Sequence, residues 1–61
     1  MRKVFVDGKQ VGALVQELPE LFPDWTIALE GLECNIIVPT LEQAETYATR
    51  FFEGRKVTYE E

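Results

Sequence analysis

The sequence contains no histidine and a single cysteine, Cys34. Zinc fingers, histidine-dependent triads and Cys–His dyads are therefore excluded, because each needs these side chains in a cluster. One cysteine cannot form an internal disulfide, so the fold must be stable without one, as is typical of proteins in a reducing cytoplasm. We therefore predict a protein that is not an enzyme, has no catalytic or metal-binding residues and no cofactor, and lies in a reducing cytoplasm.

Other common sequence signals are missing too. Gly8 and Gly12 match neither a Walker loop nor a dinucleotide-binding fingerprint, so nucleotide binding is not indicated. The apolar run that follows Arg2 and Lys3 ends at Asp7, from which we predict neither a signal peptide nor a membrane span. Six basic against eleven acidic residues give a net charge of −5, which argues against direct binding of nucleic acid through phosphate contacts.

The chain has enough apolar residues for one small core. It has 61 residues, of which 46% are hydrophobic, so a disordered chain is not expected. A chain of this length lies at the low edge of what folds unaided, and there is no room for a second domain. We predict a single domain over residues 1–61.

The first third of the chain allows two interpretations. Residues 4–6 form a β-branched and aromatic run, which predicts a short strand. Asp7-Gly8 is compatible with a two-residue hairpin turn, but Val11, Leu14, Val15 and Leu18 have the i, i+3, i+4, i+7 spacing of a helix. We therefore predict a helix that is capped by Asp7 and Gln10 and ends at Pro19. Gly12 would weaken this helix, which suggests either close packing on the sheet or a hairpin instead.

The rest of the chain has clearer patterns. Alternating apolar residues predict a strand over 25–29 and an antiparallel strand over 34–38. Residues 40–43 resemble a capping box at the start of a helix that ends near Gly54, and residues 55–59 predict a last strand. The element order β-α-β-β-α-β predicts an α+β fold of the ferredoxin-like, split βαβ type, a four-stranded antiparallel sheet with two helices on one face.

The periodicities also predict which residues form the core. We expect Leu21 and Phe22 to cover one end of it. We expect Cys34 to be buried because it alternates onto the same face as Ile36, and to be unreactive because the nearby Glu30 and Glu33 would not activate its thiol. The predicted core residues are Val4, Val6, Val11, Leu14, Val15, Leu18, Trp25, Ile27, Leu29, Cys34, Ile36, Val38, Leu41, Ala44, Ala48, Phe51 and Val57.

The distribution of charge is uneven along the chain. The forty residues from Gln10 to Thr49 contain no lysine or arginine. If the first and last strands are neighbours, Arg2, Lys3, Arg55 and Lys56 should gather at one side, and the carboxylates should spread over the rest. Such carboxylates either keep a small apolar protein in solution or bind a basic partner, since a row of them can imitate DNA phosphates. The candidate partner-binding residues are Glu17, Glu20, Asp24, Glu30, Glu33, Glu42 and Glu45.

In its size, its acidity, its unpaired acidic stretch and its lack of catalytic residues, the chain resembles the small acidic proteins of phages and mobile elements. These include anti-CRISPR proteins, several of which are DNA mimics. The resemblance implies an inhibitor of a basic nucleic-acid-binding protein or complex, such as a Cas effector, in the cytoplasm of a bacterial host cell.

Two further interpretations remain open. Residues 39–44, Pro-Thr-Leu-Glu-Gln-Ala, are similar to the strand-to-helix junction of HicB-type antitoxins, which would imply a small basic toxin as partner. Alternatively, Phe5 and Ile37 lie on the opposite face of their strands from the predicted core, and could form an apolar contact in a regulatory or assembly module that does not depend on charge. We expect a monomer or a weak homodimer.

Overall fold

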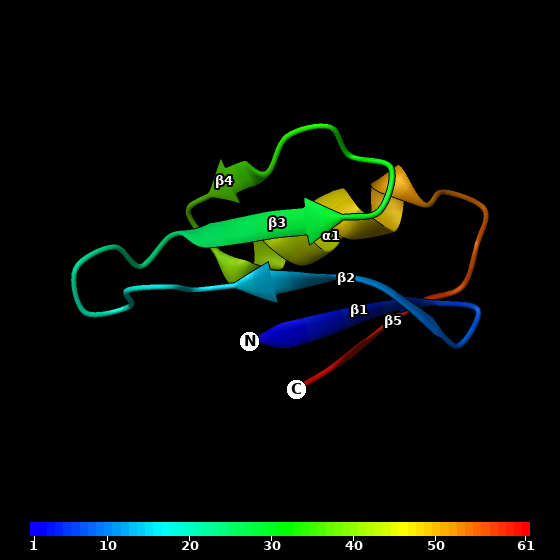
Figure 1. Ribbon diagram of the computed structural model, residues 1–61, viewed down its shortest axis with the longest axis horizontal. Coiled ribbons are helices and arrows are strands. Elements are labelled where there is room, and N and C mark those ends of the chain that lie inside the picture. The colour runs from blue at the N-terminus through cyan, green and yellow to red at the C-terminus, as the bar shows by residue number, and fades with distance from the viewer.

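The computed structural model describes residues 1–61 and has one helix packed on one face of a five-stranded antiparallel sheet (Figure 1). The strands lie in the order β4-β3-β2-β1-β5. The elements are β1 (Arg2–Val6), β2 (Lys9–Val15), β3 (Trp25–Leu29), β4 (Ile36–Val38), α1 (Leu41–Phe51) and β5 (Val57–Glu60). The fold is therefore α+β, but the predicted ferredoxin-like arrangement with four strands and two helices is wrong.

The error lies in the segment after the first strand, which is β2 and not a helix. Asp7 and Gly8 have φ values of 53° and 86°, and positive φ at both central residues is what a type I′ hairpin turn requires. The turn returns the chain directly into β2, which pairs antiparallel with β1. The hairpin interpretation of Asp7-Gly8 is thus the correct one.

A β-bulge explains why β2 has the spacing of a helix. Val4 pairs with Gly12 and Phe5 with Gln10, so Val11 has no partner on β1. The extra residue shifts the alternation of side chains along the strand. As a result both Val11 and Leu14, three residues apart, pack in the core beneath α1.

Gly12 is required by the close approach of β2 and β3. A Cβ atom at this position would collide with the carbonyl oxygen of Ala28 and lie 2.9 Å from Leu29 Cα. Of the two explanations for Gly12, packing of a helix on the sheet is wrong and the hairpin is correct, and the close approach is between two strands.

Helix α1 begins where its sequence predicts, but its C-cap is Phe52, two residues before the predicted Gly54. The Thr40 side chain accepts a hydrogen bond of 3.1 Å from the backbone N–H of Gln43, and Gly54 follows the helix with a φ of 85°. Ala44 and Ala48 are fully buried against the sheet, because their small side chains let the helix lie close to β2, β3 and β4. α1, the chain's one helix, is neither long enough nor apolar enough to cross a bilayer.

The core is smaller than predicted. The prediction is confirmed for the seven buried residues and is wrong for Leu18, Cys34 and Phe51, which are exposed. Leu18 and Cys34 lie in loops, and Phe51 is the last residue of α1. The buried residues are Val4, Val6, Leu14, Ile27, Leu29, Ala44 and Ala48.

Candidate interaction surface

The seven candidate carboxylates come from three segments of the chain. Glu17, Glu20 and Asp24 lie in the loop between β2 and β3, and Glu30 and Glu33 lie in the loop between β3 and β4. The other two, Glu42 and Glu45, lie in the first half of α1. All are exposed except Glu45, which is half-buried.

The sheet topology separates these segments into two groups. β3 runs from the first loop to the second, so the two loops leave opposite ends of this strand (Figure 1). β4 runs antiparallel to β3 and returns the chain to the first end, where α1 begins. Glu17, Glu20, Asp24 and Glu42 therefore share one end, and Glu30 and Glu33 lie at the other.

The whole net charge of the protein is concentrated at the first end, which we call the acidic end. β1 begins and β5 finishes there, so it holds seven acidic and two basic side chains: Glu17, Glu20, Asp24, Glu42, Glu45, Glu60 and Glu61, with Arg2 and Lys3. The opposite end has four of each: Asp7, Glu30, Glu33 and Glu53, with Lys9, Arg50, Arg55 and Lys56. The net charges are thus −5 and zero.

The basic residues do not gather at one side as predicted. β1 and β5 are neighbours, as expected, but they are antiparallel. Arg2 and Lys3 at the start of β1 therefore lie at the opposite end from Arg55 and Lys56, which precede β5.

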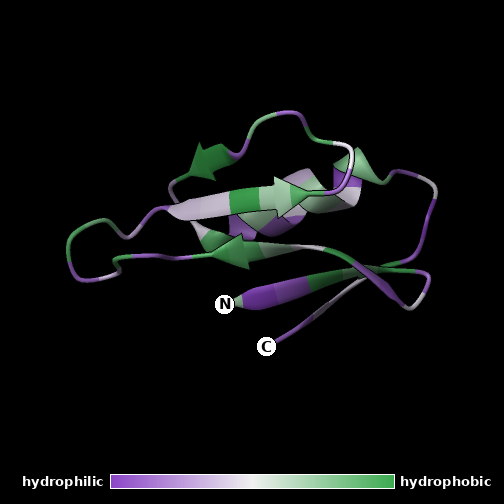
Figure 2. Ribbon diagram, viewed as in Figure 1, coloured by the Kyte–Doolittle hydropathy of each residue, from purple (hydrophilic) through white to green (hydrophobic).

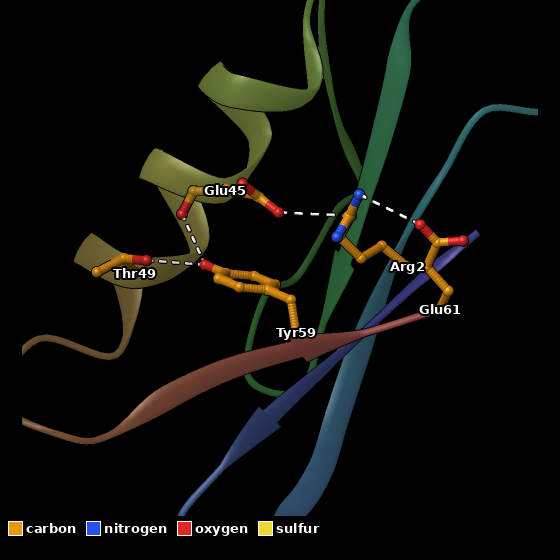
Figure 3. Close-up of polar contacts among 5 residues, drawn as sticks. All are labelled: Arg2, Glu45, Thr49, Tyr59 and Glu61. Atoms are coloured by element: carbon orange, nitrogen blue, oxygen red, sulfur yellow. Dashed lines mark hydrogen bonds and ion pairs between the residues drawn. The ribbon is translucent and has the colours of Figure 1, made fainter.

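One of the seven candidate carboxylates is neutralised inside the fold. Arg2 Nε lies 3.4 Å from Glu45 Oε2, and Arg2 Nη2 lies 3.6 Å from Glu61 Oε1 (Figure 3). The other six candidates have no cationic group within 4.0 Å, since the remaining ion pair joins Arg55 to Asp7. The acidic end therefore presents four unpaired candidates, namely Glu17, Glu20, Asp24 and Glu42.

The loop between β2 and β3 is held in shape by its own hydrogen bonds. The N–H groups of Leu21 and Phe22 donate to the carbonyl oxygen of Leu18 at 3.0 and 2.7 Å, which closes a tight turn. Across the base of the loop, the side-chain amide of Gln16 donates to the carbonyl oxygen of Pro23 at 2.7 Å. The loop therefore holds its three carboxylates on an ordered backbone.

The same loop exposes apolar side chains, contrary to the prediction that they contribute to the core. Leu21 and Phe22 do not cover the core but are 71% and 61% exposed, and Leu18 is 54% exposed. In Figure 2 this loop projects at one end of the molecule, and hydrophobic and hydrophilic stretches alternate along it. Pro19 and Pro23, which bracket Glu20, Leu21 and Phe22, are a usable signal for a projecting turn.

A polar cluster fixes α1 to β5 beside the acidic end (Figure 3). The Tyr59 hydroxyl donates to the carbonyl oxygen of Glu45 at 2.7 Å and lies 2.8 Å from Thr49 Oγ1. Burial raises the pKa of the Tyr59 phenol above its ordinary value; the hydrogen bond with Thr49 opposes this rise, and the negative charge of Glu45 adds to it. These hydrogen bonds connect α1 to β5, although α1 packs mainly on β2, β3 and β4.

Replacing Tyr59 with phenylalanine should lower the free energy of unfolding by about 1 kcal/mol at neutral pH, the usual net value of a hydrogen bond. The difference from wild type should shrink at high pH. The folded state holds the phenol proton more tightly than the unfolded state, so the Tyr59 contribution is complete below the ordinary pKa of 10.0 and is lost as the pH rises through the raised pKa. Urea unfolding of both proteins at several pH values checks this, and a difference that stays constant through alkaline pH would contradict it.

The remaining candidates lie elsewhere. Cys34 is exposed in the loop before β4. Phe5 and Ile37 both lie on the uncovered face of the sheet, because their strand neighbours pack beneath α1. They are on β1 and β4, however, three inter-strand spacings or about 14 Å apart. The structure thus does not bring them into one apolar contact.

No three His, Cys, Asp or Glu side chains cluster as possible metal ligands, and no buried side-chain polar atom lacks a hydrogen-bond partner. Searches against protein-family profiles, curated proteins and solved structures find nothing significantly similar to this chain.

Proposed function

We propose that this protein is a small cytoplasmic inhibitor that binds the basic nucleic-acid-binding site of a protein partner, such as a Cas effector, through its acidic end. The observation that supports this proposal is the concentration of the entire net charge of −5 at one end of the molecule. Carboxylates kept only for solubility need no such concentration, since mixed charges spread over the surface serve that purpose.

The arrangement suits a partner that normally holds phosphates. Lysines and arginines that bind phosphate oxygens also bind carboxylates, and they would meet four unpaired carboxylates on one loop and the start of α1. Charge complementarity of this kind speeds association and makes binding sensitive to salt. The acidic end would then exclude DNA or RNA from the site by occupying it, and the protein itself would bind no nucleic acid.

The structure offers a matched pair of variants for testing this proposal. Glu17→Lys/Glu20→Lys reverses two charges at the acidic end, and Glu30→Lys/Glu33→Lys reverses two at the opposite end, so both have the same net charge. All four side chains are exposed in loops, and the fold should tolerate either change. We would measure displacement of a fluorescent duplex from a purified Cas effector or restriction enzyme by anisotropy.

We expect wild type to displace the duplex at low salt, and to lose this ability as the salt concentration rises. The Glu17→Lys/Glu20→Lys variant should be weaker by about ten-fold or more, because each reversal places a cation against the basic site of the partner. The variant at the opposite end should remain close to wild type. Equal loss in both variants, or a complex that contains the duplex and this protein together, would overturn the proposal.

A further inference from the structure

The β2–β3 loop carries three large apolar residues that do not contribute to the hydrophobic core. Leu18, Leu21 and Phe22 are 54%, 71% and 61% exposed, and none of them packs against the core cluster. Small proteins seldom leave several such residues together on one projecting turn without a partner to cover them. We call these three residues the apolar tip; Figure 2 shows the projecting loop that carries them.

The apolar tip is organised before any partner binds. The turn is closed by the two hydrogen bonds to the Leu18 carbonyl oxygen, and the Gln16 side chain fixes its base. Pro19 and Pro23 further restrict the backbone of the loop. Binding through this loop would therefore cost little conformational entropy, which is the advantage of a preorganised contact.

The charges around the apolar tip identify the kind of surface that it fits. Glu17, Glu20 and Asp24 flank the three apolar residues within the same nine-residue loop. These carboxylates would repel an anionic membrane surface, and two acidic ends of −5 each would repel one another in a head-to-head dimer. The complement is instead a protein surface with an apolar depression between lysine or arginine side chains.

We propose that the apolar tip inserts into such a depression on the basic partner, and that Glu17, Glu20 and Asp24 pair with the cations around it. This inference rests on the proposed function and adds to it a specificity that charge alone lacks. A groove built only for phosphates offers no place for Leu21 and Phe22. The tip therefore selects, among basic proteins, those whose cationic site also contains an exposed apolar pocket.

Two defined probes separate the apolar contribution from the electrostatic one. The first is a 14-residue helical peptide of lysine and leucine with its leucines on one face, and the second has serine in place of each leucine. Binding of both labelled peptides would be measured by anisotropy at micromolar concentration, and the contacts would be mapped by amide chemical shifts of the ¹⁵N-labelled protein. The variant is Leu18→Ser/Leu21→Ser/Phe22→Ser, and the control is Ile37→Ser, another exposed apolar residue on a different element.

We expect wild type to bind the lysine–leucine peptide at least about ten-fold more tightly than the lysine–serine peptide, with shifts concentrated in residues 16–24. The triple variant should lose this preference but retain its affinity for the lysine–serine peptide, and Ile37→Ser should behave as wild type. Circular dichroism would verify that the triple variant is folded, as expected for exposed residues.

The outcomes distinguish the two proposals. If wild type binds both peptides equally, or if the triple variant keeps the preference, the apolar tip is not a docking element, although the acidic end still binds cations. Shifts confined to the uncovered sheet face around Ile37, or association of the protein with itself through the loop in sedimentation, would also overturn the inference. If neither peptide binds, the proposed function fails, and this inference fails with it.

Discussion

Replacing Gly12 with alanine should cost about 3 kcal/mol or more of the free energy of unfolding, which is at or above the usual range for overpacking. The new methyl group would collide with the carbonyl oxygen of Ala28 and the Cα atom of Leu29, and both are backbone atoms of the paired strand. A side chain could rotate away, but these atoms can move only if β3 shifts relative to β2. A domain of this size has a total stability of about 3–9 kcal/mol, so the change should remove about a third or more of it.

The control for this prediction is Gly8→Ala in the hairpin turn. A Cβ atom at Gly8 meets nothing within 4 Å, but the residue has a φ of 86°, so only backbone strain opposes the change. We expect a loss of about 1–2 kcal/mol there. Urea unfolding of the two variants gives the comparison, and the close approach of β2 and β3 would be refuted by a Gly12 variant as stable as the Gly8 variant.

Truncation of Ile27 to alanine should cost about 2–5 kcal/mol. Ile27 is fully buried in β3, where it pairs with Leu14 on one side and Ile36 on the other, beneath α1. The neighbouring backbone is fixed in the sheet on both sides, so the cavity cannot close easily. Thermal unfolding followed by circular dichroism should show a large drop in the midpoint.

Phe51→Ala provides the comparison for Ile27→Ala, because the sequence predicts both residues to be in the core. Phe51 is 38% exposed and mainly contacts other aromatic rings, with centroids 6.2 Å from Tyr47 and 5.0 Å from Phe52. Its removal should cost only about 1–2 kcal/mol, the value of such partly exposed aromatic pairs. A loss as large as that of Ile27→Ala would mean that Phe51 is buried in solution.

The elements that could be predicted are those whose signal is local: a regular alternation of apolar and polar residues, or a capping residue. The alternation around Ile27 predicts β3 correctly, and Thr40 marks the start of α1, because each signal depends only on residues close in the sequence. β2 could not be recognised by period, since the bulge places Val11 and Leu14 on the same side of a strand. Three-residue spacing of apolar residues is normally the property of a helix, and only the positive φ values at Asp7 and Gly8 settle the choice.

The candidate surface was predictable in composition but not in arrangement. The sequence shows that Glu17 and Glu30 belong to one stretch without cations, but their separation to opposite ends follows from the direction of β3. Likewise, the pairing of Glu45 with Arg2 joins residues at distant positions in the chain. The apolar tip could not be predicted because leucine and phenylalanine are usually buried, and the neighbouring sequence does not show that no other element packs over Leu21 and Phe22.

The strand order of the sheet has a consequence for how this protein can meet other chains. Its two open edges are β4, with three residues and a following Pro39 that has no N–H to donate, and β5, with four residues between Lys56 and Glu61. Short edges bounded by proline and charge are poor templates for an added strand, so they protect against edge-to-edge aggregation. Backbone pairing of the β-augmentation type is therefore disfavoured, and recognition falls to side chains carried on the loops.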